Sequence, residues 1–246
     1  MTTSVMLTTF NRLSLTQRTF DNFFATTKSP YHLIITDNGS TDGTPEYLKS
    51  LKVNEFCLSY DIHLNAENLG IARGRNRGLK IAEKYNAEYL CTMDPDVELP
   101  DDWLGKCIDI IGSNPNFVIG VNFEDTTYPP ITINNKTFQL KARGNLGSAL
   151  MVFKKELHNK IGYFYTDWPK PRYAHEDADA GQRMRLAGYK LGYLLENGVH
   201  LGVGAEDSGE YRQMKDECSK ANLTQFHQNC ALYTSGKKSI YIPFNG

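Results

Sequence analysis

The stretch Tyr89–Trp103 reads YLCTMDPDVELPDDW, an apolar run that ends at two aspartates, Asp94 and Asp96, with a proline between them. The run Tyr89–Met93 predicts a short buried strand. Two carboxylates this close repel each other, so holding both ionised in a cleft is costly unless a cation lies beside them. Mg²⁺ and Mn²⁺ take such oxygen ligands and share them with substrate phosphates. The alternative interpretation is a solvated acidic turn around Pro95.

Composition restricts the classes of protein that this sequence can encode. The 246 residues are 40% hydrophobic and 22% charged, which is typical of a soluble globular protein. The net charge of -1 gives no indication of the broad basic surface that non-specific binding to nucleic acid or to a membrane needs, although a local basic groove stays open. Five cysteines without a C-x-x-C pair indicate reduced thiols. No apolar run approaches about 20 residues and no signal peptide is recognised, so we expect a cytoplasmic protein, with the inner membrane surface as the alternative location.

The predicted strand is one of several that alternate with helices, which favours a mostly parallel sheet covered on both faces. Strands are expected at Val5–Phe10, Leu33–Ile35 and Phe56–Leu64, with helices starting at the capping box Ser14–Gln17, at Thr44-Pro45 and over Ile71–Tyr85. After Asp96 strands predominate, at Phe117–Phe123, Ile131–Leu140 with a turn at Asn134-Asn135, and Leu146–Phe153. The expected elements that follow are a helix over Glu176–Ala187 ended by Gly188, a strand Leu191–Leu195, a helix after Asp207 and a strand Ile240–Phe244.

Polar loops follow three of these strands, at Thr8–Asn11, Asp37–Asp42 and Asp94–Asp96. The carboxyl ends of parallel strands meet at one edge of a sheet, where ligands bind in open α/β folds. The sequence therefore predicts a binding site at this edge. For Asp37 alone, a role in the turn is an equal alternative.

The segment Asn68–Gly78 places glycines at every fourth residue, at Gly70, Gly74 and Gly78, which gives a helix one smooth face for packing on the sheet. The spacing is not that of a dinucleotide-binding fingerprint. Arg75 lies off the direction of the neighbouring arginines on the helical wheel, so we expect it to face the ligand.

Acidic residues open the helix that follows His175. The helix dipole favours carboxylates in a first turn, which is a sufficient structural explanation for Asp179. The same field keeps a carboxylate ionised and able to accept a proton. A lone histidine such as His200 is more often structural than a metal ligand, unless an independent metal signal exists.

Seven motifs follow one another along the chain: TTFNR (8–12), ITDNGSTDGT (35–44), NLGIARGRNRGL (68–79), MDPDVELPDDWL (93–104), GSALMVFKK (147–155), HEDADAGQRMRLAGYKL (175–191) and VHLG (199–202). In this order they resemble the family 2 glycosyltransferases of the GT-A fold, over about residues 4 to 202.

The resemblance implies an α/β GT-A fold, with a mostly parallel central sheet flanked by helices and a smaller mixed acceptor lobe. It implies one domain over 1–246, with a nucleotide-binding lobe at about 1–100 and an acceptor-binding lobe at about 101–246. The implied activity is metal-dependent transfer of one sugar, with inversion, from a nucleotide-diphosphate sugar, and UDP is the expected nucleotide. The acceptor hydroxyl could belong to a glycan, a lipid-linked glycan or a protein, and a nucleic-acid acceptor stays open.

The resemblance also assigns roles to individual positions. Asp37 would bind the nucleobase, Asp94 the ribose or the metal, and Asp96 and His200 would hold Mn²⁺ or Mg²⁺. Asp177 matches the catalytic base, with Glu176 as the neighbouring candidate. The other donor-binding positions implied are Thr8, Phe10, Asn11, Asn68, Arg75, Asn76, Gly147 and Ser148.

The sequence departs from the family at Thr8, where many members have proline, and no membrane helices follow the motifs. We therefore expect transfer of a single sugar to a soluble or peripheral acceptor. The segment Trp168–Tyr173 is interpreted as a mobile loop over the acceptor cleft. Two alternatives are a nucleotidyltransferase, which would release pyrophosphate but normally needs a glycine-rich loop that Thr8–Arg12 lacks, and a non-catalytic protein that binds a nucleotide sugar.

Overall fold

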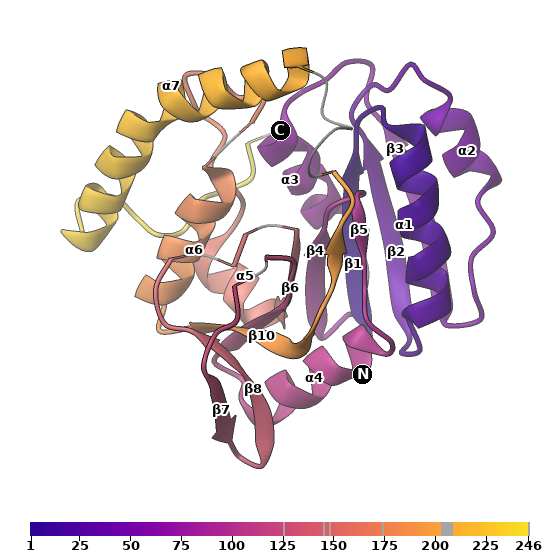
Figure 1. Cartoon of the computed structure of the whole chain (residues 1–246). Coiled ribbons are helices and arrows are strands. Elements are labelled where there is room, and N and C mark those ends of the chain that lie inside the picture. The colour runs from indigo at the N-terminus through magenta and orange to yellow at the C-terminus, as the bar shows by residue number, and fades with distance from the viewer. Residues whose placement is uncertain (125, 145, 148, 174, 203–208, 246) are drawn as a thin grey trace.

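The computed structural model describes residues 1–124, 126–144, 146–147, 149–173, 175–202 and 209–245 (Figure 1). Its centre is a nine-stranded sheet in the order β3-β2-β1-β4-β9-β6-β10-β8-β7. The strands are β1 (Thr3–Thr9), β2 (Tyr31–Asp37), β3 (Cys57–Leu64), β4 (Tyr89–Met93), β6 (Phe117–Asn122), β7 (Pro130–Ile133), β8 (Lys136–Lys141), β9 (Leu150–Lys154) and β10 (Lys190–Asn197). The four strands from β3 to β4 are parallel, whereas β9, β8 and β7 bring antiparallel pairings. The change from parallel to antiparallel pairing after β4 agrees with the change of pattern that the sequence shows after Asp96.

Helices cover both faces of the sheet because its strands are apolar on both sides. Val5 and Leu7 of β1 point into one core and Met6 points into the other. The first core is closed by α1 (Leu13–Thr26), α2 (Thr44–Ser50) and α4 (Trp103–Ser113). The second is closed by α3 (Ile71–Ala82), α5 (Lys155–Ile161) and α6 (Glu176–Leu186). A long helix, α7 (Gly209–Thr234), lies across the end of the molecule toward which β1 runs (Figure 1).

Several predicted elements have the bounds that the sequence indicated. β4 spans Tyr89–Met93, as predicted. The predicted hairpin turns at Asn134 and Asn135, whose φ angles of 49° and 62° are both left-handed, as a two-residue hairpin turn requires. The helix α6 ends before Gly188, which has a φ of 88°.

Other predictions were wrong in detail. The capping box at Ser14 does not form, because α1 begins at Leu13, whose backbone N–H is bound instead by the Asp42 carboxylate at 2.9 Å. Ile240–Phe244 is no strand, since only an isolated bridge joins Ile242 to Gly162. The helices α4 and α5 were not predicted.

The predicted close packing of the glycine-rich helix on the sheet is confirmed. A Cβ on Gly74 would lie 2.5 Å from Thr8 Cγ2, and one on Gly78 would lie 3.3 Å from Met6 Cβ. Gly70 has another role, because its Cβ would lie 2.1 Å from the carbonyl oxygen of Pro171. This packing places the end of β1 against α3 and so brings Arg75 to the edge of the sheet.

Candidate functional site

A cavity of about 670 Å³ lies where the carboxyl ends of β1 and β4 meet α3, α6 and α7. The register of the sheet creates this meeting point, because Thr9 at the end of β1 is paired with Asp37 at the end of β2. The cavity wall contains predicted residues from five motifs, namely Thr8, Phe10, Asn68, Arg75, Asp94, Asp96, Glu176, Asp177 and His200. The structure therefore brings together the polar segments that the sequence placed on one edge.

The two aspartates of the opening stretch lie in the cavity wall and each is bound by an arginine. Arg75 Nη2 donates to Asp94 Oδ1 at 2.6 Å, and Arg12 Nη1 donates to Asp96 Oδ2 at 3.0 Å. Burial, and next the charge of Asp94, raise the pKa of Asp96 above its ordinary value. Each aspartate of this pair therefore lies beside a guanidinium cation, which agrees with the expectation that two neighbouring carboxylates need positive charge beside them.

His200 reaches Asp96 through a small second sheet. β5 (Val97–Glu98) and β11 (Val199–His200) pair antiparallel, with His200 opposite Val97. The backbone N–H of Leu201 donates to the carbonyl of Asp96 at 2.7 Å. As a result His200 Nε2 lies 3.9 Å from Asp96 Oδ1, while its Nδ1 is buried without a hydrogen-bond partner among the described residues.

This arrangement fits a divalent cation in part. Two ligand atoms that each lie about 2.1 Å from one Mg²⁺ can be no more than about 4.2 Å apart, so Asp96 and His200, at 3.9 Å, are close enough to share a cation. Among the described residues, however, no group of three His, Cys, Asp or Glu side chains is placed to hold a metal. The described residues would therefore supply a minority of the ligands of such a cation.

Arg75 links the aspartates to the start of α6. Its guanidinium is 4% exposed and its Nη1 donates to Glu176 Oε1 at 2.8 Å. Burial alone would lower the pKa of Arg75, but the charges of Asp94 and Glu176 outweigh it and raise this pKa. Burial, and next the charge of Asp177, raise the pKa of Glu176 to about 7. The expectation that Arg75 faces the ligand site agrees with its place in the cavity wall.

Asp177 stands next to Glu176 in the first turn of α6 and also lines the cavity. The preceding residue, His175, has a left-handed φ of 70°, and this turn starts the helix at the cavity wall. Asp177 Oδ1 accepts the backbone N–H of Ala178 at 2.6 Å, at the positive end of the helix dipole. Asp177 is thus a half-buried carboxylate, whereas Glu176 is buried and ion-paired.

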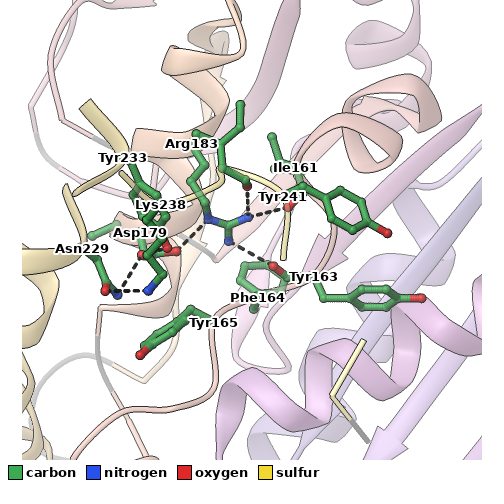
Figure 2. A network of polar contacts seen from close by, with 12 residues as sticks. Ile161, Tyr163, Phe164, Tyr165, Asp179, Arg183, Asn229, Tyr233, Lys238 and Tyr241 are labelled. Carbon is green, nitrogen blue, oxygen red and sulfur yellow. Dashed lines mark hydrogen bonds and ion pairs between the residues drawn. The ribbon is translucent and has the colours of Figure 1, made fainter. Parts of the chain in front are cut away.

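A buried network of polar side chains fixes α6 and connects it with α7 (Figure 2). Asp179 is fully buried and accepts from Arg183 Nε at 2.7 Å and from the Tyr233 hydroxyl at 3.1 Å. Arg183 also donates to the carbonyls of Ile161 and Tyr163 at 2.7 and 3.1 Å. The helix dipole is therefore not the only explanation for Asp179, because an ion pair two residues from Asp177 holds the helix in place.

Two predicted donor-binding residues are engaged within the loops beside the cavity. Asp37 is 1% exposed, and its carboxylate accepts from Thr9 Oγ1 at 2.9 Å and from the backbone N–H of Ser40 at 2.9 Å. Ser40 Oγ accepts the backbone N–H of Asn11 at 2.7 Å, and Asn11 Oδ1 accepts that of Thr41 at 2.9 Å. Neither Asp37 nor Asn11 lines the cavity, and contact of Asp37 with a nucleobase stays a prediction.

The remaining predicted residues are divided between the cavity and the interior. Asn76 is buried, and its side chain binds both the N–H and the carbonyl of Phe164, at 2.8 and 2.9 Å, which is a structural role. Gly147 has a φ of 70° and is absent from the cavity wall. Ser148 lies outside the described residues. The backbone N–H of Asp94 donates to the carbonyl of Ala149 at 3.0 Å, so Ala149 lies beside the acidic pair.

One wall of the cavity was not predicted. Five residues of α7 line it, at spacings that place them on one helix face: Glu210, Tyr211, Met214, Lys215 and Ser219. The helix is anchored by Asn222, which accepts the N–H of Lys170 at 2.9 Å and donates to the carbonyls of Lys170 and Tyr173 at 2.8 and 2.9 Å. The Trp168–Tyr173 segment does border the cavity through Tyr173, and α7 holds it. In the sequence, the i, i+4 spacing of Tyr211 and Lys215 is the signal that could have indicated this helix face.

Two further expectations from the sequence concern thiols and membranes. All five cysteines are free thiols, as predicted, and three of them are buried. Within the described part of the chain, no helix combines the length and the apolar character that crossing a membrane would need.

Comparisons with known proteins agree with the resemblance seen in the motifs. Residues 4–169 match the family model described as Glycosyl transferase family 2. The poly-beta-1,6-N-acetyl-D-glucosamine synthase of Staphylococcus epidermidis is 23% identical over 206 residues, which cover 77% of this chain and 47% of that protein. The chain thus spans less than half the length of the curated relatives that it matches first.

Two solved structures share the fold. The mannosyltransferase PcManGT from Pyrobaculum calidifontis, in complex with GDP-Man and Mn²⁺, superposes with a TM-score of 0.64 at 16% identity and covers 92% of this chain and 64% of that one. TarS 1-349 of S. aureus in complex with UDP-GlcNAc gives 0.59 at 15% identity, covering 95% and 72%. The α/β architecture with its mostly parallel central sheet is the GT-A fold, as predicted.

Proposed function

Because the chain belongs to glycosyl transferase family 2, we propose that this glycosyltransferase moves one sugar from a UDP-linked donor to an acceptor hydroxyl, with inversion and with a divalent cation. The observation that carries the proposal is the convergence of Asp96, His200 and Asp177 on one cavity. In this proposal residues of about 1–100 bind the nucleotide and those of about 101–246 bind the acceptor. The five free cysteines favour a reducing compartment, the cytoplasm.

The metal-binding part of the proposal rests on Asp96 and His200. Their separation of 3.9 Å suits a shared Mn²⁺ or Mg²⁺, and Asp94 stands beside them, bound to Arg75. When bound, the cation would neutralise charge on the departing diphosphate. The PcManGT structure contains Mn²⁺, which favours the same type of ion here.

The donor would lie against the end of β1. Thr8, Phe10 and Asn68 line the cavity there and can form the wall for the base and ribose, with Asp37 supporting the loop behind them. A uridine donor is favoured by the TarS structure with UDP-GlcNAc, and a guanosine donor is the alternative favoured by PcManGT.

Asp177 is the general base in this proposal. The acceptor hydroxyl attacks the anomeric carbon from the face opposite the diphosphate, the bond from that carbon to the phosphate oxygen breaks, and Asp177 takes the hydroxyl proton. Asp177 lies in the first turn of α6, at the positive end of the helix dipole. Glu176 is the weaker candidate because it is buried and Arg75 already binds it at 2.8 Å.

The test is a screen of nucleotide sugars, each with Mn²⁺ and with a chelator, for thermal stabilisation and for the product released. The proposal predicts Mn²⁺-dependent stabilisation by one donor and release of a nucleoside diphosphate. Release of pyrophosphate would show a nucleotidyltransferase, and donor binding without turnover across a wide acceptor panel would show a non-catalytic binding protein. The length of the glycan product separates transfer of one sugar from polymerisation.

A further inference from the structure

Arg12 makes a direct ion pair with the aspartate proposed to hold the cation. Its Nη1 donates to Asp96 Oδ2 at 3.0 Å, and both side chains are mostly buried, at 23% and 11% exposed. The guanidinium carbon also lies 5.2 Å from the ring of Tyr211 on α7. Arg12 therefore sits at the junction of β1, the acidic pair and α7.

The backbone that presents Arg12 is strained. Asn11 and Arg12 have φ angles of 54° and 62°, a left-handed conformation that residues other than glycine rarely adopt. Three bonds from the 40–42 loop hold this turn, through Ser40 and Thr41 to Asn11 and through Asp42 to the N–H of Leu13. A conformation held by so many contacts indicates that the direction of the Arg12 side chain matters.

The space around the ion pair is limited as well. A Cβ on Gly202 would lie 2.2 Å from Asp96 Oδ2 and 3.0 Å from Arg12 Nη2. Glycine at this position therefore lets the chain after His200 pass directly beside the Arg12–Asp96 pair. The guanidinium, the carboxylate and any cation that His200 and Asp96 share therefore have to fit into the same small space.

We propose that Arg12 and the divalent cation compete for Asp96, and that the guanidinium which the cation displaces binds the diphosphate of the donor. The inference rests on the proposed function and deepens it by naming a donor-binding residue. A cation at Asp96 repels the guanidinium 3.0 Å from the same carboxylate and weakens that ion pair. A diphosphate bound to that cation lies within reach of Arg12, and the planar guanidinium forms paired hydrogen bonds with phosphate oxygens.

A merely structural role for Arg12 makes a different prediction. If the ion pair only ties α1 to the segment after β4, its removal loosens the site, and Mn²⁺ affinity falls or stays constant. Competition predicts that Mn²⁺ affinity rises when Arg12 is removed, while nucleotide affinity falls. The two effects have opposite signs, which general loosening of the site does not produce.

The experiment measures Mn²⁺ binding to the full chain by titration calorimetry without nucleotide, and then UDP binding at saturating Mn²⁺. For Arg12→Ala we expect Mn²⁺ to bind about threefold to tenfold more tightly and UDP about tenfold more weakly. Arg12→Lys keeps the charge but not the paired bonds, so its Mn²⁺ affinity stays near that of the wild type and its UDP affinity is intermediate. The matched control is Arg18→Ala, which removes an exposed arginine of α1 paired with Glu98 and leaves both affinities unchanged.

Arg12→Gln, which keeps the length and hydrogen-bonding capacity of the side chain, replaces Arg12→Ala if the alanine variant does not fold. The inference is overturned if the wild type binds UDP with Mn²⁺ but the folded uncharged variant binds Mn²⁺ no more tightly than the wild type does. That result would leave the proposed function intact. A wild-type protein that binds neither Mn²⁺ nor any nucleotide would overturn both.

Discussion

The substitution Glu176→Gln should increase the free energy of unfolding, relative to that of the wild type, more at alkaline pH than at acidic pH. Glu176 is buried against Arg75, and its pKa is raised from 4.5 to about 7, with burial as the main cause. Folding raises the pKa of this carboxyl. At pH values between its pKa in the unfolded state and its pKa in the folded state, it therefore binds more protons in the folded state. The free energy of unfolding of the wild type therefore loses a contribution as the pH rises from about 4.5 to about 7.

The size of the effect follows from the two pKa values. At pH 5 the folded carboxyl is almost fully protonated, and at pH 8 it is almost fully ionised at the cost of desolvation. With a pKa of about 7 in the folded state and 4.5 in the unfolded state, the ionisation of Glu176 lowers the free energy of unfolding by about 2 to 3 kcal/mol more at pH 8 than at pH 5. Glutamine cannot ionise and does not incur this loss.

The assay is urea unfolding of wild type and Glu176→Gln at pH 5 and at pH 8, followed by the fluorescence of the buried Trp103 and Trp168. Comparing variant with wild type at each pH cancels the other titrating groups. The expected result is a stability difference that shifts in favour of the variant by about 2 to 3 kcal/mol between the two values of pH. Glu217→Gln removes an exposed carboxylate bound to Lys170 and should show no such rise. A difference for Glu176→Gln that is the same at both pH values would refute the burial argument.

Three further substitutions test separate parts of the site. Asp177→Asn should keep donor binding and reduce transfer by about 10²- to 10⁴-fold in a steady-state assay, and normal turnover would move the base to another residue. Gly202→Ala places a methyl group 2.2 Å from Asp96 Oδ2 and should weaken Mn²⁺-dependent UDP binding by about tenfold, whereas calorimetry that shows unchanged binding would contradict the close packing described here. Asn222→Ala removes three hydrogen bonds between α7 and the 170–173 segment and should lower the free energy of unfolding by about 2 to 4 kcal/mol, so that a denaturant midpoint equal to the wild-type value would show that α7 is held by other contacts.

Strands and helices were predictable from the sequence where the local residue pattern agrees with the burial of the element in the fold. The apolar run Tyr89–Met93 became β4 with the predicted bounds, since a strand buried on both faces carries a continuous apolar signal. The helix α4 was missed because Gly105 and Gly112 lower the helix propensity of a segment whose apolar face only the sheet reveals. The start of α1 was misplaced because its cap comes from Asp42, far along the chain, and no local motif encodes such a contact.

The candidate site shows the same limit. The position of Asp94 and Asp96 at the carboxyl edge of the sheet follows from the parallel topology, whereas only the family resemblance indicated that Asp177 lies near them. The pairing of β5 with β11, which sets His200 beside Asp96, joins strands of two residues each and is too short for any periodic signal. The face that α7 adds to the cavity depends on anchors such as Asn222, whose partners are known only from the three-dimensional structure.

The most direct test of the central claim is the binding of UDP to wild type and to Asp96→Ala by titration calorimetry, each with Mn²⁺ and with a chelator. The account predicts that wild type binds UDP with Mn²⁺ and loses this binding with the chelator, and that the variant binds no better with Mn²⁺ than without it. Equal, Mn²⁺-dependent binding by both proteins would contradict the assignment of Asp96 as the carboxylate that joins the donor diphosphate to the protein.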